Sequence, residues 1–140
     1  MKSSTNNTVD LAALVLRVGF GFFIAFGHGL GKLQMLLSGN FQFPPLFGLS
    51  PAINLGLATF LEFVAGLAVL VGFKTRLASL GLIGIMFVAG IIVHFSDPLF
   101  AMSAGGGSSK EMALLYLLAF AGTMILGSGR YSVDALIGKK

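Results

Sequence analysis

The chain has 140 residues, of which 56% are hydrophobic and 10% charged, with a formal net charge of +4 and a mean hydropathy of +0.94. Soluble domains carry roughly 25% charged residues, so this composition excludes an ordinary water-soluble domain and indicates an all-α, multi-pass membrane protein. The basic residues lie at the ends of apolar segments or inside them, which argues against nucleic-acid binding, and the absence of cysteine excludes disulfides, dithiol chemistry and Fe–S ligation by this chain.

Apolar runs long enough to cross a bilayer recur along the chain. They predict an antiparallel bundle of four transmembrane helices that forms a single domain over residues 1–140. The predicted helices cover residues 11–37, 51–73, 77–94 and 110–127. The first is longer than a bilayer requires, so we expect it to tilt or to extend beyond the hydrocarbon. A basic turn at residues 74–76 joins the second and third helices, and a loop with three glycines at 105–107 precedes the fourth.

Positive charge concentrates at one end of the predicted bundle. Four crossings place both termini on the same side of the membrane. On that side lie Lys2, Lys74, Arg76, Arg130, Lys139 and Lys140. The opposite end carries only Lys32 and Lys110. By the positive-inside rule, we expect a protein of the plasma membrane (the bacterial inner membrane) with both termini in the cytoplasm.

Three basic residues share one face of the first predicted helix. Arg17 and His28 are eleven residues apart, which is close to three full turns, and Lys32 lies one turn beyond His28. Such a stripe is costly in lipid and should point inward at acidic or hydrogen-bonding partners. Glu62 is the single charge of the second predicted helix. We expect Arg17 and Glu62 to form a structural ion pair that clamps the two helices together.

A second polar cluster is expected near the outer surface. At about 1.5 Å per residue, His28, His94 and Glu111 all lie roughly 25 Å above the cytoplasmic ends of three different helices. We expect these three residues, with Lys32 above them, to line a ligand-binding pocket open to the outer leaflet. In the simpler alternative, the histidines cap helix ends and bond water, while Lys32 extends to the interface. The sequence has no metal-ligand spacing and assigns no catalytic residue.

Three segments of the chain resemble the DoxX family of small four-helix membrane proteins. They are LVLRVGFGFFIAFGHGLGKL, LEFVAGLAVLVGFKTRLAS and EMALLYLLAFAGTMILGSGRYSVDAL, and GRYSVDAL is the most specific part. The family takes its name from a subunit linked to quinone reduction in sulfur oxidation, and relatives are associated with redox and thiol-stress complexes. The resemblance implies that the family's polar motif positions are Arg17, His28, Lys32, Glu62, His94 and Glu111.

Two classes of function remain open at this point. In the first, the chain is the membrane subunit of a quinone-linked redox system, and its His/Glu cluster binds a quinone head group or relays protons. In the second, it is a non-enzymatic membrane anchor, an assembly partner or a small-solute transporter. A haem held between His28 and His94 is a third, weaker option. The expected partners are the lipid bilayer, a soluble or membrane redox protein, and further copies of the chain.

Overall fold

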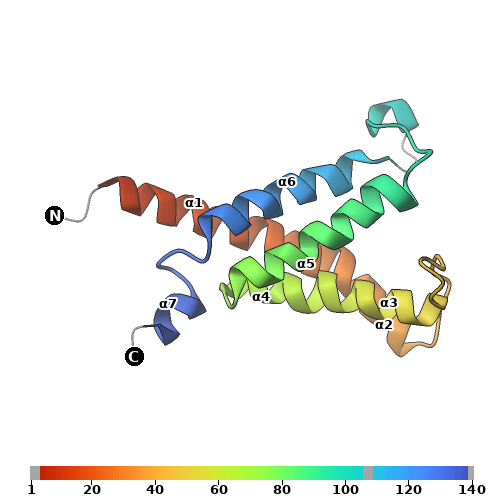
Figure 1. Ribbon diagram of the computed structural model, residues 1–140, viewed down its shortest axis with the longest axis horizontal. Helices are drawn as coiled ribbons and strands as arrows, with labels where there is room; N and C mark the ends of the chain where they lie inside the picture. The colour runs from red at the N-terminus through yellow and green to blue at the C-terminus, as the bar shows by residue number, and fades with distance from the viewer. Residues whose placement is uncertain (1–3, 106–108, 139–140) are drawn as a thin grey trace.

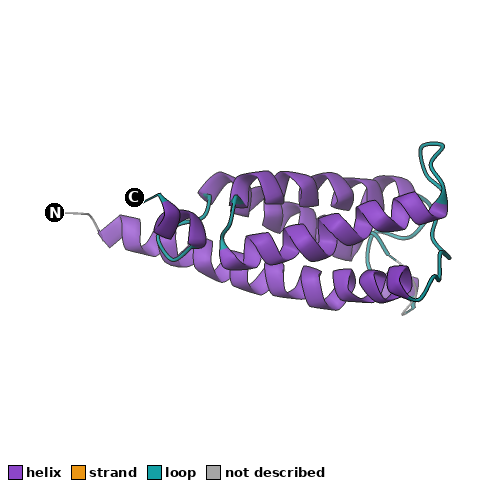
Figure 2. Cartoon of the chain, turned by 90° about the horizontal axis from the view of Figure 1, so that it is seen from below, coloured by secondary structure: helices purple, strands orange, loops and turns teal. Residues whose placement is uncertain are grey.

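The computed structural model describes residues 4–105 and 109–138, and every regular element within these ranges is helical (Figures 1 and 2). The long helices run beside one another, and the short α7 lies at the same end of the molecule as the start of α1 (Figure 1). The sequence-based predictions for Lys2, Lys139, Lys140, Gly106 and Gly107 concern residues outside the described ranges.

The first helical stretch begins earlier than predicted. It consists of α1 (Ser4–Phe22), the π-helical segment η1 (Phe23–Gly29) and α2 (Leu30–Leu37). The predicted start at residue 11 is therefore too late, because the polar residues just before it already belong to the helix. Asp10 lies inside the helix instead, and its Oδ1 accepts a hydrogen bond from the backbone N–H of Arg130 at 3.0 Å.

The second and third helical stretches follow the predicted positions closely. The second consists of α3 (Pro51–Thr59), η2 (Phe60–Ala65) and α4 (Gly66–Val71), and the third of α5 (Thr75–Phe87) and η3 (Val88–Val93). The Ser50 hydroxyl accepts a hydrogen bond from the N–H of Ile53, and Pro51 occupies the first helical position, so both mark the start of α3. Gly72 ends α4 in the left-handed conformation, with φ +77°.

The last part of the chain contains two short elements that were not predicted. The fourth long helix is α6 (Glu111–Leu126); the short ones are the 3-10 turn η4 (Met102–Ala104) and α7 (Val133–Ile137). The stretches Asn7–Leu37, Pro51–Val71 and Thr75–Val93 are long and apolar enough to cross a membrane, while α6 is apolar but shorter. The predicted all-α membrane architecture is confirmed at this level.

Large apolar side chains cover the outside of the molecule, while several polar ones are buried. Leu118 and Ile125 are 67% and 74% exposed, whereas Arg17 is only 1% exposed. The core contains Ile24, Val69, Leu82 and Phe120, all fully enclosed. An apolar exterior around buried polar groups suits a protein whose solvent is lipid.

Glycines set the register between the first two membrane helices. A Cβ added to Gly21 would lie 2.8 Å from the backbone N of Leu70, and one added to Gly29 would lie 2.5 Å from the backbone N of Phe63. Because the backbones approach this closely, the two antiparallel helices have only one way to align. This register decides which polar residues meet.

Candidate functional site

The polar residues of the membrane helices surround a small cavity far from α7. Its volume is about 150 Å³. It is lined by Ile24, His28, Lys32, Glu62, Met86, Ala89, His94, Ser109, Met112, Ala113 and Tyr116. All the long helical stretches of the described chain contribute to this lining, so the cavity exists only in the assembled fold.

An ion pair forms one wall of the cavity. The Nζ of Lys32 lies 2.5 Å from Oε2 of Glu62, and the two side chains are 21% and 6% exposed. The predicted pairing of Glu62 with Arg17 is therefore wrong, as is the expectation that Lys32 extends to the interface. The cause is the register: Gly29 packs against Phe63, which places Lys32, and not Arg17, within reach of Glu62.

Arg17 binds backbone carbonyl groups at the opposite end of the molecule. Its guanidinium donates to the carbonyl oxygens of Leu70 at 3.2 Å, Val69 at 3.4 Å and Tyr131 at 2.6 Å. The carbonyl groups in the last turn of α4 lie at the negative end of the helix dipole, so they suit a buried cation. Arg17 thus holds α1, α4 and the segment before α7 together, which is a structural role, but with other partners than predicted.

His28 lies beside the ion pair with its ring in the cavity lining. The ring meets Tyr116 edge-to-face at 5.5 Å between centroids, and Tyr116 stacks on Phe120 at 5.9 Å. Within the described residues, neither ring nitrogen of His28 has a hydrogen-bond partner. A ligand in this cavity would therefore contact a half-buried imidazole, a phenol and an ion pair.

Three π-helical segments meet the same cavity. His28 lies in η1, Glu62 in η2 and Ala89 in η3, and all three residues are part of the lining. A π-helical turn inserts an extra residue into the helical repeat and redirects the side chains that follow, and such turns are frequent at functional sites. In this chain they interrupt otherwise regular apolar helices at the level where polar groups gather.

The remaining predicted site residues divide into one inside the cavity and one outside it. His94 is in the lining, and its Nδ1 lies 2.7 Å from Oδ2 of Asp97, which sequence reasoning had treated only as a turn residue. Glu111 is not in the lining. Its Oε2 accepts a hydrogen bond from the N–H of Ala101 at 2.7 Å and so stabilises the loop before α6.

Sequence reasoning thus placed His28, Lys32 and His94 together, wrongly added Glu111, and missed Glu62 and Tyr116 as cavity residues. Tyr116 had a usable signal, because it is one of two tyrosines in the chain and lies inside an otherwise apolar helix. Among the described residues, no group of three or more His, Asp or Glu side chains is arranged to hold a metal ion.

Helices of membrane-spanning length, a lipid-suited exterior and a buried polar cavity together define a multi-pass membrane protein. Residues 12–95 match the profile of the DoxX family. The chain is also 31% identical to the inner membrane protein YqjF of Escherichia coli (strain K12) over 134 residues, covering 94% of this chain and 95% of that relative. The chain belongs to the DoxX family, as its sequence motifs predicted.

The match to the inner membrane protein YqjF, together with the apolar helices, places the chain in the bacterial inner membrane. The residues that match the family profile contain His28, Lys32, Glu62 and His94, but not Tyr116 or the GRYSVDAL segment. No solved structure matches the chain.

Proposed function

We propose that this protein is a four-span membrane subunit of a quinone-linked redox system, and that its polar cavity binds the quinone head group. The observation that carries this proposal is the His28 imidazole. It lines the cavity without a hydrogen-bond partner in the described chain, next to the Lys32–Glu62 pair and the Tyr116 ring. A half-buried imidazole that lines a cavity and has no partner within the described chain is free to exchange hydrogen bonds with a ligand, which supports a binding site here.

The chemistry of the lining suits such a head group. A quinone is a flat ring with carbonyl oxygens that accept hydrogen bonds, and its reduction consumes two electrons and two protons. The His28 ring and the Tyr116 hydroxyl can both donate hydrogen bonds to those oxygens. Ile24, Met86 and Ala113 provide an apolar surface for the ring.

The size of the cavity limits what it can enclose. Sites for drug-sized ligands are roughly 300–1,000 Å³, and this cavity has about 150 Å³. The quinone ring itself fits this volume, while the second fused ring of a naphthoquinone or an isoprenoid tail would extend toward the surrounding lipid. The apolar exterior of the helices accommodates such a tail.

The proposed orientation has both termini in the cytoplasm. Within the described residues, Lys74, Arg76 and Arg130 lie at the α7 end, while the other end carries Lys110 and a Lys32 that is paired with Glu62. This distribution supports a cytoplasmic α7 end under the positive-inside rule. The fourth crossing is α6, whose sixteen residues span about 24 Å and so require local thinning of the bilayer or polar ends that reach the interface.

The test is isothermal titration calorimetry, in which menadione, a soluble quinone, is added to the purified full-length protein in mild detergent. We expect His28→Leu to weaken binding by about ten-fold or more, the value of a lost hydrogen bond to a buried ligand. Gln34→Leu, a polar-to-leucine change at an exposed position of α2, is the matched control and should bind like the parent. Equal affinity for the parent and His28→Leu would contradict the proposal. A protein that co-purifies with a partner and binds no quinone would favour the anchor alternative.

A further inference from the structure

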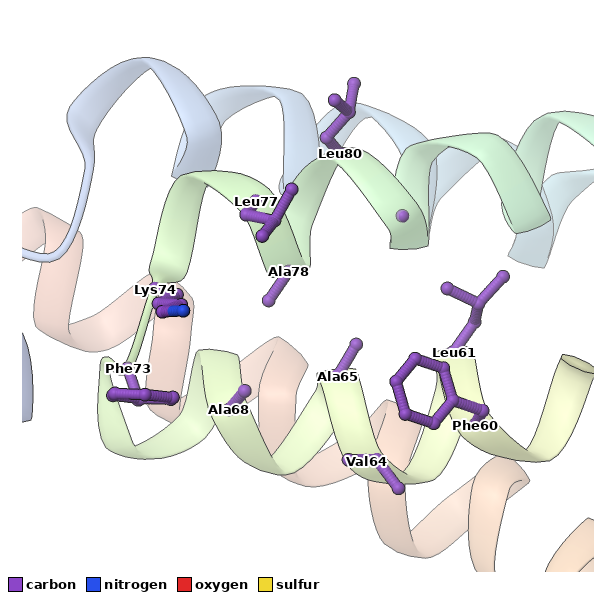
Figure 3. A pocket seen from close by; sticks show the side chains of 11 residues that line it. Phe60, Leu61, Val64, Ala65, Ala68, Phe73, Lys74, Leu77, Ala78 and Leu80 are labelled. Carbon is purple, nitrogen blue, oxygen red and sulfur yellow. The ribbon is translucent and has the colours of Figure 1, made fainter.

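A second hollow lies on the lipid-facing side of the molecule, between the second and third membrane helices. Figure 3 shows this α4–α5 groove, in which Ala65 and Ala68 face Ala78 across the gap, with Leu61 and Leu77 at its sides. Its volume is about 500 Å³. Small alanine side chains form its floor, and every lining residue except Lys74 is apolar, so the groove suits a hydrocarbon chain.

One end of the groove changes from apolar to basic. Lys74 and Leu77 belong both to the groove and to an adjoining polar pocket of about 420 Å³, which also includes Arg76 and Ser128. Lys74 has a positive φ of +44°, and its ammonium lies 5.7 Å from the ring centroid of Phe73, another groove residue. The backbone and this cation–π contact therefore hold the ammonium at the end of the groove.

The two cations at this end outnumber the one acid beside them, and neither forms an ion pair with it. The acid of the polar pocket is Asp134, and its two carboxylate oxygens already accept hydrogen bonds from the backbone N–H groups of Lys74 and Thr75, at 2.9 and 3.3 Å. Within the described residues, the side chains of Lys74 and Arg76 make no ion pair. An apolar groove that ends at two unpaired cations is complementary to a molecule with a hydrocarbon chain and an anionic head.

We propose that the α4–α5 groove is a binding site for an anionic phospholipid, with an acyl chain along Ala65, Ala68 and Ala78 and the phosphate at Lys74 and Arg76. The basic end of this site lies at the other end of the molecule from the cavity that contains His28, and the two linings share no residue. The proposal therefore does not rest on the proposed quinone site. The groove holds one chain of the lipid, and the second chain remains in the bilayer.

The test is native mass spectrometry of the full-length protein released from detergent, with dioleoyl-phosphatidylglycerol or dioleoyl-phosphatidylcholine added at equal concentration. We expect one phosphatidylglycerol per chain to bind more tightly than phosphatidylcholine. Arg76→Gln and Lys74→Asn should each reduce that preference about five-fold, since each removes one cation near the phosphate. Asparagine is chosen at position 74 because it tolerates the left-handed conformation. Lys110→Gln, the same loss of charge at the other end of the molecule, should leave the preference unchanged.

A second pair of variants tests the groove itself. Ala78→Phe fills it and should reduce binding of both lipids, and Ala68→Leu provides the same test with a smaller change if Ala78→Phe does not fold. Equal binding of the two lipids by the parent would overturn the proposal, as would an equal loss with Lys110→Gln. Displacement of phosphatidylglycerol by glycerol 3-phosphate at the same concentration would show a phosphate site without a chain site. A lipid-free dimer that Ala78→Phe dissociates would instead assign the groove to a second copy of the chain.

Discussion

The ammonium of Lys32 lies 2.5 Å from the carboxylate of Glu62, and this contact joins the first and second membrane helices beside the polar cavity. The Glu62 side chain is 6% exposed. A carboxylate in this position depends on its partner, because lipid and the apolar core offer nothing else to compensate its charge.

Removal of Lys32 alone should therefore destabilise the protein. We expect Lys32→Met to lower the free energy of unfolding by about 3 kcal/mol, the lower end of the range for breaking a buried ion pair, because Lys32 is itself partly exposed. The double variant Lys32→Met/Glu62→Met should recover most of this loss. The free energy of unfolding is measured by adding denaturant to the protein in detergent while circular dichroism monitors the loss of helix. Lys110→Met, which removes a lysine without an ion pair, serves as the control, and a Lys32→Met protein as stable as that control would contradict the prediction.

The close approach at Gly29 gives a second prediction. A Cβ at this position would lie 2.5 Å from the backbone N of Phe63, so Gly29→Ala must push the two helices apart. Because the same register brings Lys32 to Glu62, we expect lower thermal stability and weaker menadione binding together. Gly27→Ala is the matched control, since a Cβ there meets nothing within 4 Å. Equal melting temperatures for the two variants would show that the glycine contact does not set the register.

Gly72 allows a comparison between strain and packing. A Cβ at Gly72 would overlap the Arg17 guanidinium, and the residue has φ +77°. Gly39 has a similar φ of +72° but open space around it. Both alanine variants carry the backbone strain of roughly 1–2 kcal/mol. Only Gly72→Ala should lose more, because its Cβ displaces Arg17 from the carbonyl groups of Leu70 and Tyr131 and also pushes against the Cβ of Ser132. The difference between the two unfolding free energies measures the cost of both contacts, and no difference would mean that Arg17 and Ser132 adapt at no cost.

Glu111 should matter for the loop and not for ligand binding. Its carboxylate accepts a hydrogen bond from the N–H of Ala101, so Glu111→Ala should cost about 1 kcal/mol of stability and leave menadione affinity unchanged. Glu111→Gln keeps an acceptor oxygen and should retain most of the stability. If Glu111→Ala loses as much menadione binding as His28→Leu, the prediction is wrong and Glu111 belongs to the ligand site.

The absence of cysteine makes the topology directly measurable. Single cysteines at Asn40 and at Leu136 occupy exposed positions at opposite ends of the molecule. With both termini in the cytoplasm, a membrane-impermeant maleimide added to intact cells should label Asn40→Cys and spare Leu136→Cys. Permeabilised cells, in which both should react, provide the control. Labelling of Leu136→Cys in intact cells would reverse the proposed orientation.

The apolar runs predicted the long helices well, because a membrane helix needs a continuous stretch of hydrophobic residues and little else. They could not predict how those helices align. Alignment depends on close backbone contacts at Gly21 and Gly29, and glycines recur along the chain without any pattern that marks these two. The Arg17–Glu62 pairing was wrong for this reason.

Arg17 also shows a limit of arguing from charge. A buried cation was expected to pair with an acid, but Arg17 donates instead to the carbonyl oxygens of Val69, Leu70 and Tyr131, and such backbone acceptors cannot be recognised from the sequence. His28 and Lys32 were placed correctly because helical spacing puts them on one face. Glu111 was misplaced because depth along a helix says nothing about which way a side chain points.

The hydrogen bond from Arg17 to Tyr131 also constrains how the protein is made. The two residues are 114 positions apart, so the ribosome completes nearly the whole chain before Arg17 gains this partner. Until then, the first helix must enter the bilayer with an incompletely compensated guanidinium, which the insertion machinery and nearby water have to tolerate. A nascent chain that terminates before residue 131 would leave this arginine without its last acceptor, deep in the first membrane helix.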